Sequence, residues 1–266
     1  MRIGVLFVSI LALAVQSFGV EIIGHRGASF DAPENTMAAF RLGYEHGADG
    51  VELDIHLTKD DKVVVMHDFD TARVGGSTNK IADSTLAELR GFEIGRWGKW
   101  TNANFHESIP LLSEVLPIIP AGKKLFIEIK TGPEIVPPLV DVLKEAKAKP
   151  EQLVIITFNF ESAIAAKKLL PKLKTYWLVG YAKDKATGKF PDLKETIAKA
   201  KAGKLDGLDL NFNWPLTKEM VGEIKRAGLE CHVWTVDDAA KAKELVAAGV
   251  DSITTNRPKW LREQLR

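Results

Sequence analysis

The sequence predicts a single α/β domain that closes into a (β/α)8 barrel, and three observations support this fold class. Eight short β-rich runs alternate with helical stretches along the chain, which is typical of parallel strands joined by helices. Several of the helical stretches end in glycine, at Gly47, Gly228 and Gly249, as helices that close in the left-handed conformation do. The chain has 266 residues, close to the length of about 250 that one such barrel usually needs. A doubly wound open sheet is the alternative that the pattern leaves open.

Each expected strand is a short run rich in branched apolar residues, and turn or cap residues separate it from the next element. We expect strands at 21–25, 50–56, 124–129, 153–158, 175–179, 207–211, 230–235 and 252–255. We expect helices at 36–46, 135–148, 161–170, 193–202, 218–227 and 239–248. Since helices separate the strands almost throughout, the pattern favours parallel pairing over hairpins.

One stretch interrupts the alternation after the second strand. A polar turn at 59–62 precedes an apolar run at 63–66, which together predict a hairpin. Residues from about 69 to 110 then show no regular order of strand and helix. Loops of this length inside a compact domain are usually functional or independently packed. We therefore expect an insertion at about 69–110 that folds over the barrel mouth, inside one domain that spans 20–266.

The first nineteen residues have the composition of a secretory signal peptide. Arg2 is followed by the apolar run 3–15, and small residues follow at Ser17 and Gly19. The run is shorter than the about 20 apolar residues that a membrane span needs. We predict a signal peptide at 1–19, export to the periplasm or the exterior, and no stable membrane insertion after cleavage. Cleavage at Ser17, a buried first strand and an uncleaved anchor are the alternatives.

Composition excludes several classes of protein. The formal net charge is +1, so the chain lacks the basic excess of a nucleic-acid-binding domain. Cys231 is the only cysteine, which excludes a disulfide framework and a thiolate zinc site. It lies in the apolar run 231–234, where a buried and unreactive thiol is expected. Nothing in the sequence indicates an oligomeric state.

Alternation along the second strand points to a cation site. Glu52, Asp54 and His56 share one face of the run, and apolar residues occupy the other face, which should pack on the helices. Two carboxylates turned into a barrel interior favour a bound cation, because isolated buried charge is costly. Glu128 takes the equivalent place on the next strand. Oxygen ligands favour Mg²⁺ or Ca²⁺ over zinc. A surface strand with solvated acids is the alternative.

Histidine and cationic residues are expected at the same end of the barrel. His25 and Arg26 follow the first strand and His67 ends the predicted hairpin, so both imidazoles can reach the barrel mouth. Taken alone, each histidine could merely cap a turn. Lys130 shares a face with Glu128, and Trp234 ends the seventh strand.

Two further residues, Glu34 and His56, are expected to act around the site. Glu34 could brace Arg26 or sit at the positive end of a helix, and Asn35 is a plausible N-cap for that helix. His56 is expected to support its neighbours or fill the core rather than meet a substrate.

Seven short motifs, in order along the chain, resemble the glycerophosphodiester phosphodiesterase family. They are HRG (25–27), PENT (33–36), ELDIHLTKDD (52–61), VVMHD (64–68), EIK (128–130), WTV (234–236) and ITTNRP (253–258). The resemblance implies a (β/α)8 barrel with an insertion after the second strand. It also implies hydrolysis of glycerophosphodiesters, such as glycerophosphocholine or glycerophosphoethanolamine, to sn-glycerol 3-phosphate and an alcohol.

The same resemblance implies roles for individual residues. His25 and His67 become the general acid and base, in an order that the sequence leaves open. Glu52, Asp54 and Glu128 become the ligands of Mg²⁺ or Ca²⁺.

By the same resemblance, Arg26 and Lys130 hold phosphate oxygens, and Trp234 walls the glycerol side. The attacking nucleophile is water or the neighbouring glycerol hydroxyl. A small-molecule phosphodiester is the expected partner, and the 69–110 segment is expected to recognise its alcohol group.

Two other functions remain open at this point. A lysophospholipase D would place an acyl chain against Trp97 and Trp100 of the insertion, although these residues could equally form its small core. A non-catalytic phosphodiester-binding barrel would lack one of the catalytic or ligand positions, and here all of them are filled.

Overall fold

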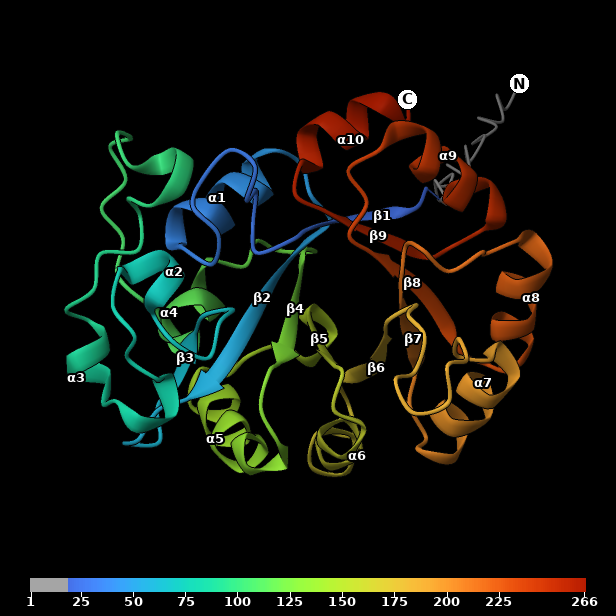
Figure 1. Ribbon diagram of the computed structural model, residues 1–266, viewed down its shortest axis with the longest axis horizontal. Coiled ribbons are helices and arrows are strands. Elements are labelled where there is room, and N and C mark those ends of the chain that lie inside the picture. Colours follow the sequence, from blue (N-terminus) through green and yellow to red (C-terminus); the bar gives the residue numbers. More distant parts are fainter. Residues whose placement is uncertain (1–18) are drawn as a thin grey trace, which may run out of the picture.

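The computed structural model describes residues 19–266 as a ring of strands surrounded by helices (Figure 1). The predicted signal peptide at 1–19 therefore lies outside the described residues, apart from Gly19. Within 19–266, no helix combines the length and the apolar character that crossing a bilayer requires.

Eight parallel strands form a closed barrel, which confirms the predicted fold and excludes an open sheet. The ring closes because β1 pairs with β9 on one side and with β2 on the other. Every predicted strand is present, with its ends within one residue of the prediction. The strands are β1 (Glu21–Gly24), β2 (Gly50–Leu57), β4 (Lys124–Ile129), β5 (Leu153–Thr157), β6 (Lys174–Val179), β7 (Gly207–Asn211), β8 (Glu230–Trp234) and β9 (Ser252–Thr255).

Helices cover the outside of the ring (Figure 1). The six predicted helices are present, and an unpredicted helix follows the last strand. The helices are α1 (Met37–Glu45), α5 (Val136–Glu145), α6 (Phe160–Leu169), α7 (Leu193–Ala202), α8 (Lys218–Arg226), α9 (Ala239–Ala248) and α10 (Pro258–Gln264). Short polar side chains cap most of their N-termini, as at Asn159, Asp192, Thr217 and Asp238.

The N-cap expected at Asn35 is wrong by one residue. Thr36 caps α1, because its side chain accepts a hydrogen bond from the backbone N–H of Ala39. Asn35 instead has a positive φ of 56°, a conformation that asparagine tolerates better than most residues. Its side chain is thereby turned away from the helix and toward the barrel.

Strand alternation divides the apolar residues between two sides of the barrel wall. Val51, Leu53 and Ile55 of β2 pack outward in a large core with residues of α1, α4 (Leu112–Val115), α5 and α6. A second large core packs α7, α8, α9 and α10 on the other half of the ring. It includes Cys231, which is fully buried and whose thiol pKa is raised by that burial. The inward-facing positions are thus left for the barrel interior and the site.

The lower half of the barrel interior is filled, so the barrel is not a pore. Ile23, Phe126, Val154, Ile156, Tyr176 and Leu178 form a compact cluster inside it. At the amino ends of the strands, the Tyr176 hydroxyl donates to Glu230 at 2.6 Å, and Lys124 pairs with Glu21 at 2.7 Å. Because these groups close the bottom, a ligand can enter only from the carboxyl ends of the strands.

The insertion packs beside the barrel, next to α1 (Figure 1). It packs on β3 (Val63–Val65), the strand just before it, which pairs antiparallel with β2 as the predicted hairpin requires. Short helices α2 (Ala72–Gly75) and α3 (Leu86–Leu89) follow. The insertion also contains 3₁₀ turns at Ile81–Asp83 and Gly98–Trp100. Three further 3₁₀ turns lie outside it, at Leu116–Ile118, Pro133–Ile135 and Pro150–Gln152. The segment has its own small core, formed by Val64, Met66, Val74, Ile81, Leu89, Ile94 and Ile109, and Trp97 packs against it.

Gly27 is the position where the fold tolerates a side chain least. It has a φ of 85°, and a Cβ there would overlap the backbone of Ala39 in α1. We expect Gly27→Ala to lower the free energy of unfolding by about 2–4 kcal/mol, from steric overlap and backbone strain together. Urea denaturation measures the change.

Gly122→Ala is the matched control for this prediction. Gly122 has a φ of 75°, but a Cβ there would meet no atom within 4 Å, so only the backbone cost of about 1–2 kcal/mol applies. Equal losses in the two variants would show that the close approach to α1 is not the constraint.

Candidate active site

A pocket opens at the carboxyl ends of the strands and gathers most of the predicted site residues. Its volume is about 190 Å³. Residues of several different strands and of the loops that follow them line it, namely His25, Arg26, Glu52, His67, Glu128, Lys130, Ile156, Phe158, Leu178, Asp209, Trp234, Thr235 and Thr254. No residue of the 69–110 segment lines this pocket. The segment packs on its own core beside β3, and its Arg73 reaches residues at the edge of the pocket. That the insertion recognises the alcohol group stays a prediction.

Three buried carboxylates form the cluster that the strand alternation predicted. One oxygen from each of Glu52, Asp54 and Glu128 lies within 4.8 Å of the others. Asp54 and Glu128 are direct neighbours in the register of β2 and β4. Oε1 of Glu52 is buried without a hydrogen-bond partner among the described residues, and Oδ1 of Asp54 meets only the ammonium of Lys130, at 3.2 Å. Buried carboxylate oxygens with so few donors fit the ligand set of a hard divalent cation.

The electrostatics of the cluster also favour a cation. Burial and the charges of Asp54 and Glu128 raise the pKa of Glu52 well above its usual value. Burial and Asp54 raise the pKa of Glu128 to about 7. Burial opposes ionisation of Asp54 as well, but Lys130 and Arg26 outweigh it and lower its pKa to about 2. A divalent ion would relieve the repulsion that raises the pKa of Glu52 and of Glu128.

Two cationic side chains stand beside the carboxylates. The backbone N–H of Arg26 donates to Oε2 of Glu52 at 2.8 Å, and its Nε lies 3.5 Å from Oδ2 of Asp54. Nζ of Lys130 donates to Glu128 at 2.8 Å and lies 3.2 Å from Oδ1 of Asp54. The site therefore presents an acidic cluster and two fixed cations to the same small space, which suits an anionic ligand bridged by a metal.

His25 is held as a neutral imidazole by its surroundings. Its Nδ1 lies 2.8 Å from Oδ1 of Asn256, whose amide N–H₂ donates to Asp237, so the Asn256 oxygen faces the ring and His25 Nδ1–H donates to it. This leaves Nε2 with a lone pair, 4.0 Å from Oε2 of Glu52. Burial and the charge of Arg26 lower the pKa of His25 to about 4.

His67 and Arg26 belong to one chain of ion pairs that passes through the insertion. Nδ1 of His67 lies 2.7 Å from Asp68, and Arg73 of α2 donates to the other Asp68 oxygen at 2.7 Å. Arg73 also binds both oxygens of Glu34, at 2.7 and 3.0 Å. Glu34 in turn accepts from Arg26 at 2.7 Å, which agrees with the predicted bracing role. Arg73 thus fixes residues on both sides of the pocket.

The remaining predicted residues lie at the edges of the pocket. Trp234 lines it, contacts Phe158 edge to face at 5.3 Å, and donates from Nε1 to the carbonyl of Asp209. His56 does not line the pocket; its Nε2 lies 3.2 Å from the carbonyl oxygen of His67, and its ring meets Phe69. Its position is that of a support for the hairpin end that carries His67.

Four residues that contact the site were not predicted for it. Asn35 binds Asp54 twice, donating to Oδ2 at 2.8 Å and accepting from its backbone N–H at 3.3 Å. Arg73 and Asn256 hold the two histidines through the contacts described above. Asp209 lies in the run Leu208-Asp209-Leu210, so the alternation that found Glu52 could also have placed it in the interior. No local sequence signal marks Arg73.

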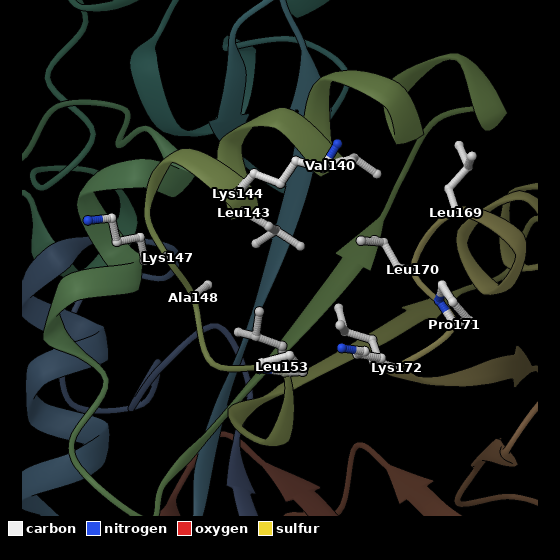
Figure 2. A pocket seen from close by; sticks show the side chains of 12 residues that line it. Val140, Leu143, Lys144, Lys147, Ala148, Leu153, Leu169, Leu170, Pro171 and Lys172 are labelled. Carbon is white, nitrogen blue, oxygen red and sulfur yellow. The ribbon is translucent and has the colours of Figure 1, made fainter.

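A second hollow lies between α5 and α6, away from these residues (Figure 2). Leu143, Leu153 and Leu170 point into it, with Lys144 and Lys172 at its edge (Figure 2). No acidic residue and no histidine lines it, so it offers neither a metal ligand nor an acid–base group.

Comparisons with known proteins agree with this geometry. The model of the glycerophosphoryl diester phosphodiesterase family matches residues 25–260. A glycerophosphodiester phosphodiesterase of Caldanaerobacter subterraneus subsp. tengcongensis is 35% identical over 253 residues, which cover 92% of this chain and 97% of the relative. One from Bacillus subtilis is 31% identical, and the match covers 89% of this chain and 83% of the relative.

Solved structures extend the likeness to three dimensions. An Oleispira antarctica phosphodiesterase in complex with the product sn-glycerol-3-phosphate superposes with a TM-score of 0.80 at 27% identity, covering 94% of this chain and 98% of that one. The family match spans the carboxylate cluster, both histidines and both cations of the pocket. The chain belongs to the glycerophosphoryl diester phosphodiesterase family.

Proposed function

We propose that this phosphodiesterase cleaves glycerophosphodiesters to sn-glycerol 3-phosphate and an alcohol with the help of a divalent cation and two histidines. The observation that carries the proposal is the buried carboxylate triad, which shares one pocket with His25, His67, Arg26 and Lys130. The product bound by the Oleispira antarctica relative supports sn-glycerol 3-phosphate as the product here.

Glu52, Asp54 and Glu128 would hold Mg²⁺ or Ca²⁺, since their donors are all oxygens. Such an ion supplies charge neutralisation at the phosphoryl oxygens during cleavage. Arg26 and Lys130 bind the remaining phosphate oxygens, because both cations already face the same space. Binding the phosphate between these groups orients the scissile bond relative to the two histidines.

We assign His25 as the general base and His67 as the general acid. His25 is neutral with its free lone pair on Nε2, so it can accept a proton from the attacking water or from the neighbouring glycerol hydroxyl. The carboxylate of Asp68 holds Nδ1 of His67 at 2.7 Å and so orients the ring, whose Nε2 can give a proton to the departing alkoxide. Arg73 keeps Asp68 in place for this task.

The structure offers no support for the lysophospholipase alternative. Trp97 packs against the insertion's core and Trp100 against Phe105, and neither lines the pocket. The non-catalytic alternative would require a missing acid, base or ligand, but both histidines and all three carboxylates are present together.

We also propose that residues 1–19 direct export, on the strength of their basic start, apolar run and small residues near Gly19.

Export has a direct test. The chain expressed with its native N-terminus in a bacterial host should reach the periplasm or medium, and sequencing of its first residues should find them at or next to Val20. A cytoplasmic product that still begins at Met1 would refute the proposal. A variant with Leu11→Arg, which places a charge in the apolar run, should block processing without touching the described domain.

Glu52→Gln should abolish the metal site while keeping the shape of the side chain. We expect glycerophosphocholine hydrolysis to fall by at least about 100-fold, since a cation supplies several kcal/mol of transition-state stabilisation. Calorimetric titration with Mg²⁺ and Ca²⁺ should lose its signal in the variant. Glu151→Gln, at an exposed position, is the control. Activity that survives in EDTA would overturn the metal assignment.

Metal binding should also depend on pH. In the wild type, affinity for Mg²⁺ should rise between about pH 6 and 8, as Glu128, whose pKa is about 7, loses its proton.

The two histidines can be separated by the leaving group. A p-nitrophenyl ester of sn-glycerol 3-phosphate needs little protonation of its leaving group, so His67→Asn should lose far less activity on it than on glycerophosphocholine. His25→Asn should lose about 10²–10⁴-fold on both substrates. If His25→Asn, rather than His67→Asn, kept most activity on the p-nitrophenyl ester, the two roles would be exchanged.

The pH dependence gives a further check. In the wild type, the acidic limb of kcat/KM should lie below the pH of about 6.5 at which an ordinary imidazole titrates, because burial lowers the pKa of His25 to about 4.

A further inference from the structure

Asp209 is a buried acid in the pocket that the chemistry described so far does not use. It lies on β7 with only 1% of its surface exposed, yet it lines the pocket. Its Oδ1 has no hydrogen-bond partner among residues 19–266. Since buried polar groups almost always have a partner, a carboxyl turned into a binding pocket without one indicates that a ligand supplies it.

Asp209 is not a fourth ligand of the metal cluster. The carboxyl oxygens that lie within 4.8 Å of one another belong to Glu52, Asp54 and Glu128. In the closed ring, β7 lies opposite β2, four strands away in either direction. No lysine, arginine or histidine of the described chain pairs with Asp209, whereas Lys130 pairs with both Asp54 and Glu128.

The carboxyl of Asp209 does nothing to stabilise the folded chain. Burial of a carboxyl without a donor is unfavourable by about 1–3 kcal/mol or more, and nothing in the described structure offsets it. A leucine, which has the same branched skeleton and is bulkier, would remove that cost. Retention of an acid here is therefore better explained by a contact with substrate than by the fold.

The neighbours of Asp209 show which part of a substrate it faces. The charged side of the pocket, which takes the phosphate, lies at β1, β2 and β4. On the opposite side Ile156, Leu178, Phe158 and Trp234 form an apolar wall, and the Trp234 indole donates to the main-chain carbonyl of Asp209. The organic part of a phosphodiester must rest against this wall, and Asp209 is the acidic group within it.

The protonation of Asp209 favours a hydroxyl over an ammonium group as its partner. Burial and the charge of Glu128 raise the pKa of Asp209 well above its usual value. A neutral carboxyl can both donate to and accept from an alcohol. A choline or ethanolamine cation would instead require the ionised form and a wider, wetter site than a carboxyl that is 1% exposed provides.

We propose that Asp209 binds the glycerol hydroxyl that is remote from the phosphate, and that it thereby selects substrates in which this hydroxyl is free. The inference rests on the proposed function. The hydroxyl next to the phosphate stays near the histidines, and the remote one extends across the barrel toward β7. A lysophospholipid acylated at that oxygen has no hydrogen to donate and brings an acyl chain to a closed apolar wall, so it is rejected.

The test pairs two variants with two substrates. The substrates are glycerophosphocholine and its analogue in which a methyl group replaces the remote CH₂OH group. The wild type should prefer glycerophosphocholine by about 10- to 100-fold in kcat/KM, the range expected for one buried hydrogen bond. Asp209→Leu should lose about that factor on glycerophosphocholine and little on the analogue. Asp209→Asn, which keeps a donor and an acceptor, should retain most of the preference.

A structural role for Asp209 predicts a different result. If the acid served the fold, Asp209→Leu would lower the urea midpoint and reduce activity equally on both substrates. Here the midpoint should stay unchanged or rise, because a buried unpartnered carboxyl is removed. Equal losses on both substrates would overturn the proposal.

Exchange of the headgroup separates the two possible partners of the acid. Glycerophosphoglycerol has no cation, so the effect of Asp209→Leu should be the same on it as on glycerophosphocholine. An effect confined to the choline substrate would overturn the hydroxyl assignment.

Binding without turnover distinguishes failure of this inference from failure of the proposed function. Calorimetry with sn-glycerol 3-phosphate and with its analogue lacking the remote hydroxyl should show a similar 10- to 100-fold contrast in the wild type and none in Asp209→Leu. An inactive chain that keeps this contrast would refute the hydrolase but not the role of Asp209. An active chain without the contrast would refute the role of Asp209 alone.

Discussion

Mutual repulsion among three buried carboxylates is the constraint around which the site is arranged. Glu52, Asp54 and Glu128 lie within 4.8 Å of one another in a part of the barrel that water barely reaches. Their environment includes two fixed cations and an amide, because Arg26, Lys130 and Asn35 all contact Asp54. Asp54, which has the most cationic and hydrogen-bonding neighbours, is the acid whose pKa falls to about 2, while the pKa of Glu52 and that of Glu128 are raised. A site of this kind is poised to take up positive charge, and its neighbours are placed to deliver an anion along with it.

The barrel makes such an arrangement possible because its interior is closed at one end and opens into a pocket at the other. At the amino ends of the strands, apolar side chains and the contacts of Tyr176 and Glu230 close the interior. At the carboxyl ends, most strands contribute a polar residue to a common pocket, whereas β5 and β6 contribute apolar ones. The cores between strands and helices are mainly apolar, and at the mouth the loop residues Arg26 and Asn35 adopt positive φ angles.

The barrel and the carboxylate cluster can be predicted from the sequence because both depend on local patterns. The two-residue period of β2 and β4 decides which side chains face inward, and this period alone places Glu52, Asp54 and Glu128 in the interior. Tertiary placement has no such pattern. The sequence predicts an insertion at about 69–110, but not that its apolar residues pack on one another beside β3, which only long-range contacts reveal. The sequence also favours Asn35 as a helix cap because asparagine commonly is one, whereas its side chain meets Asp54, nineteen positions later.

Because of Arg73, the insertion could not simply be exchanged for the corresponding segment of another protein. Although no residue of 69–110 lines the pocket, Arg73 joins Asp68 to Glu34 and so links the hairpin that carries His67 to the loop that carries Arg26. The segment is therefore not a freely exchangeable module. A chimera that imports this segment from another barrel would also have to import a guanidinium at the same point, or else change Glu34 and Asp68 together. In such a chimera the length and surface of the segment could vary, provided that the guanidinium still joins Glu34 to Asp68.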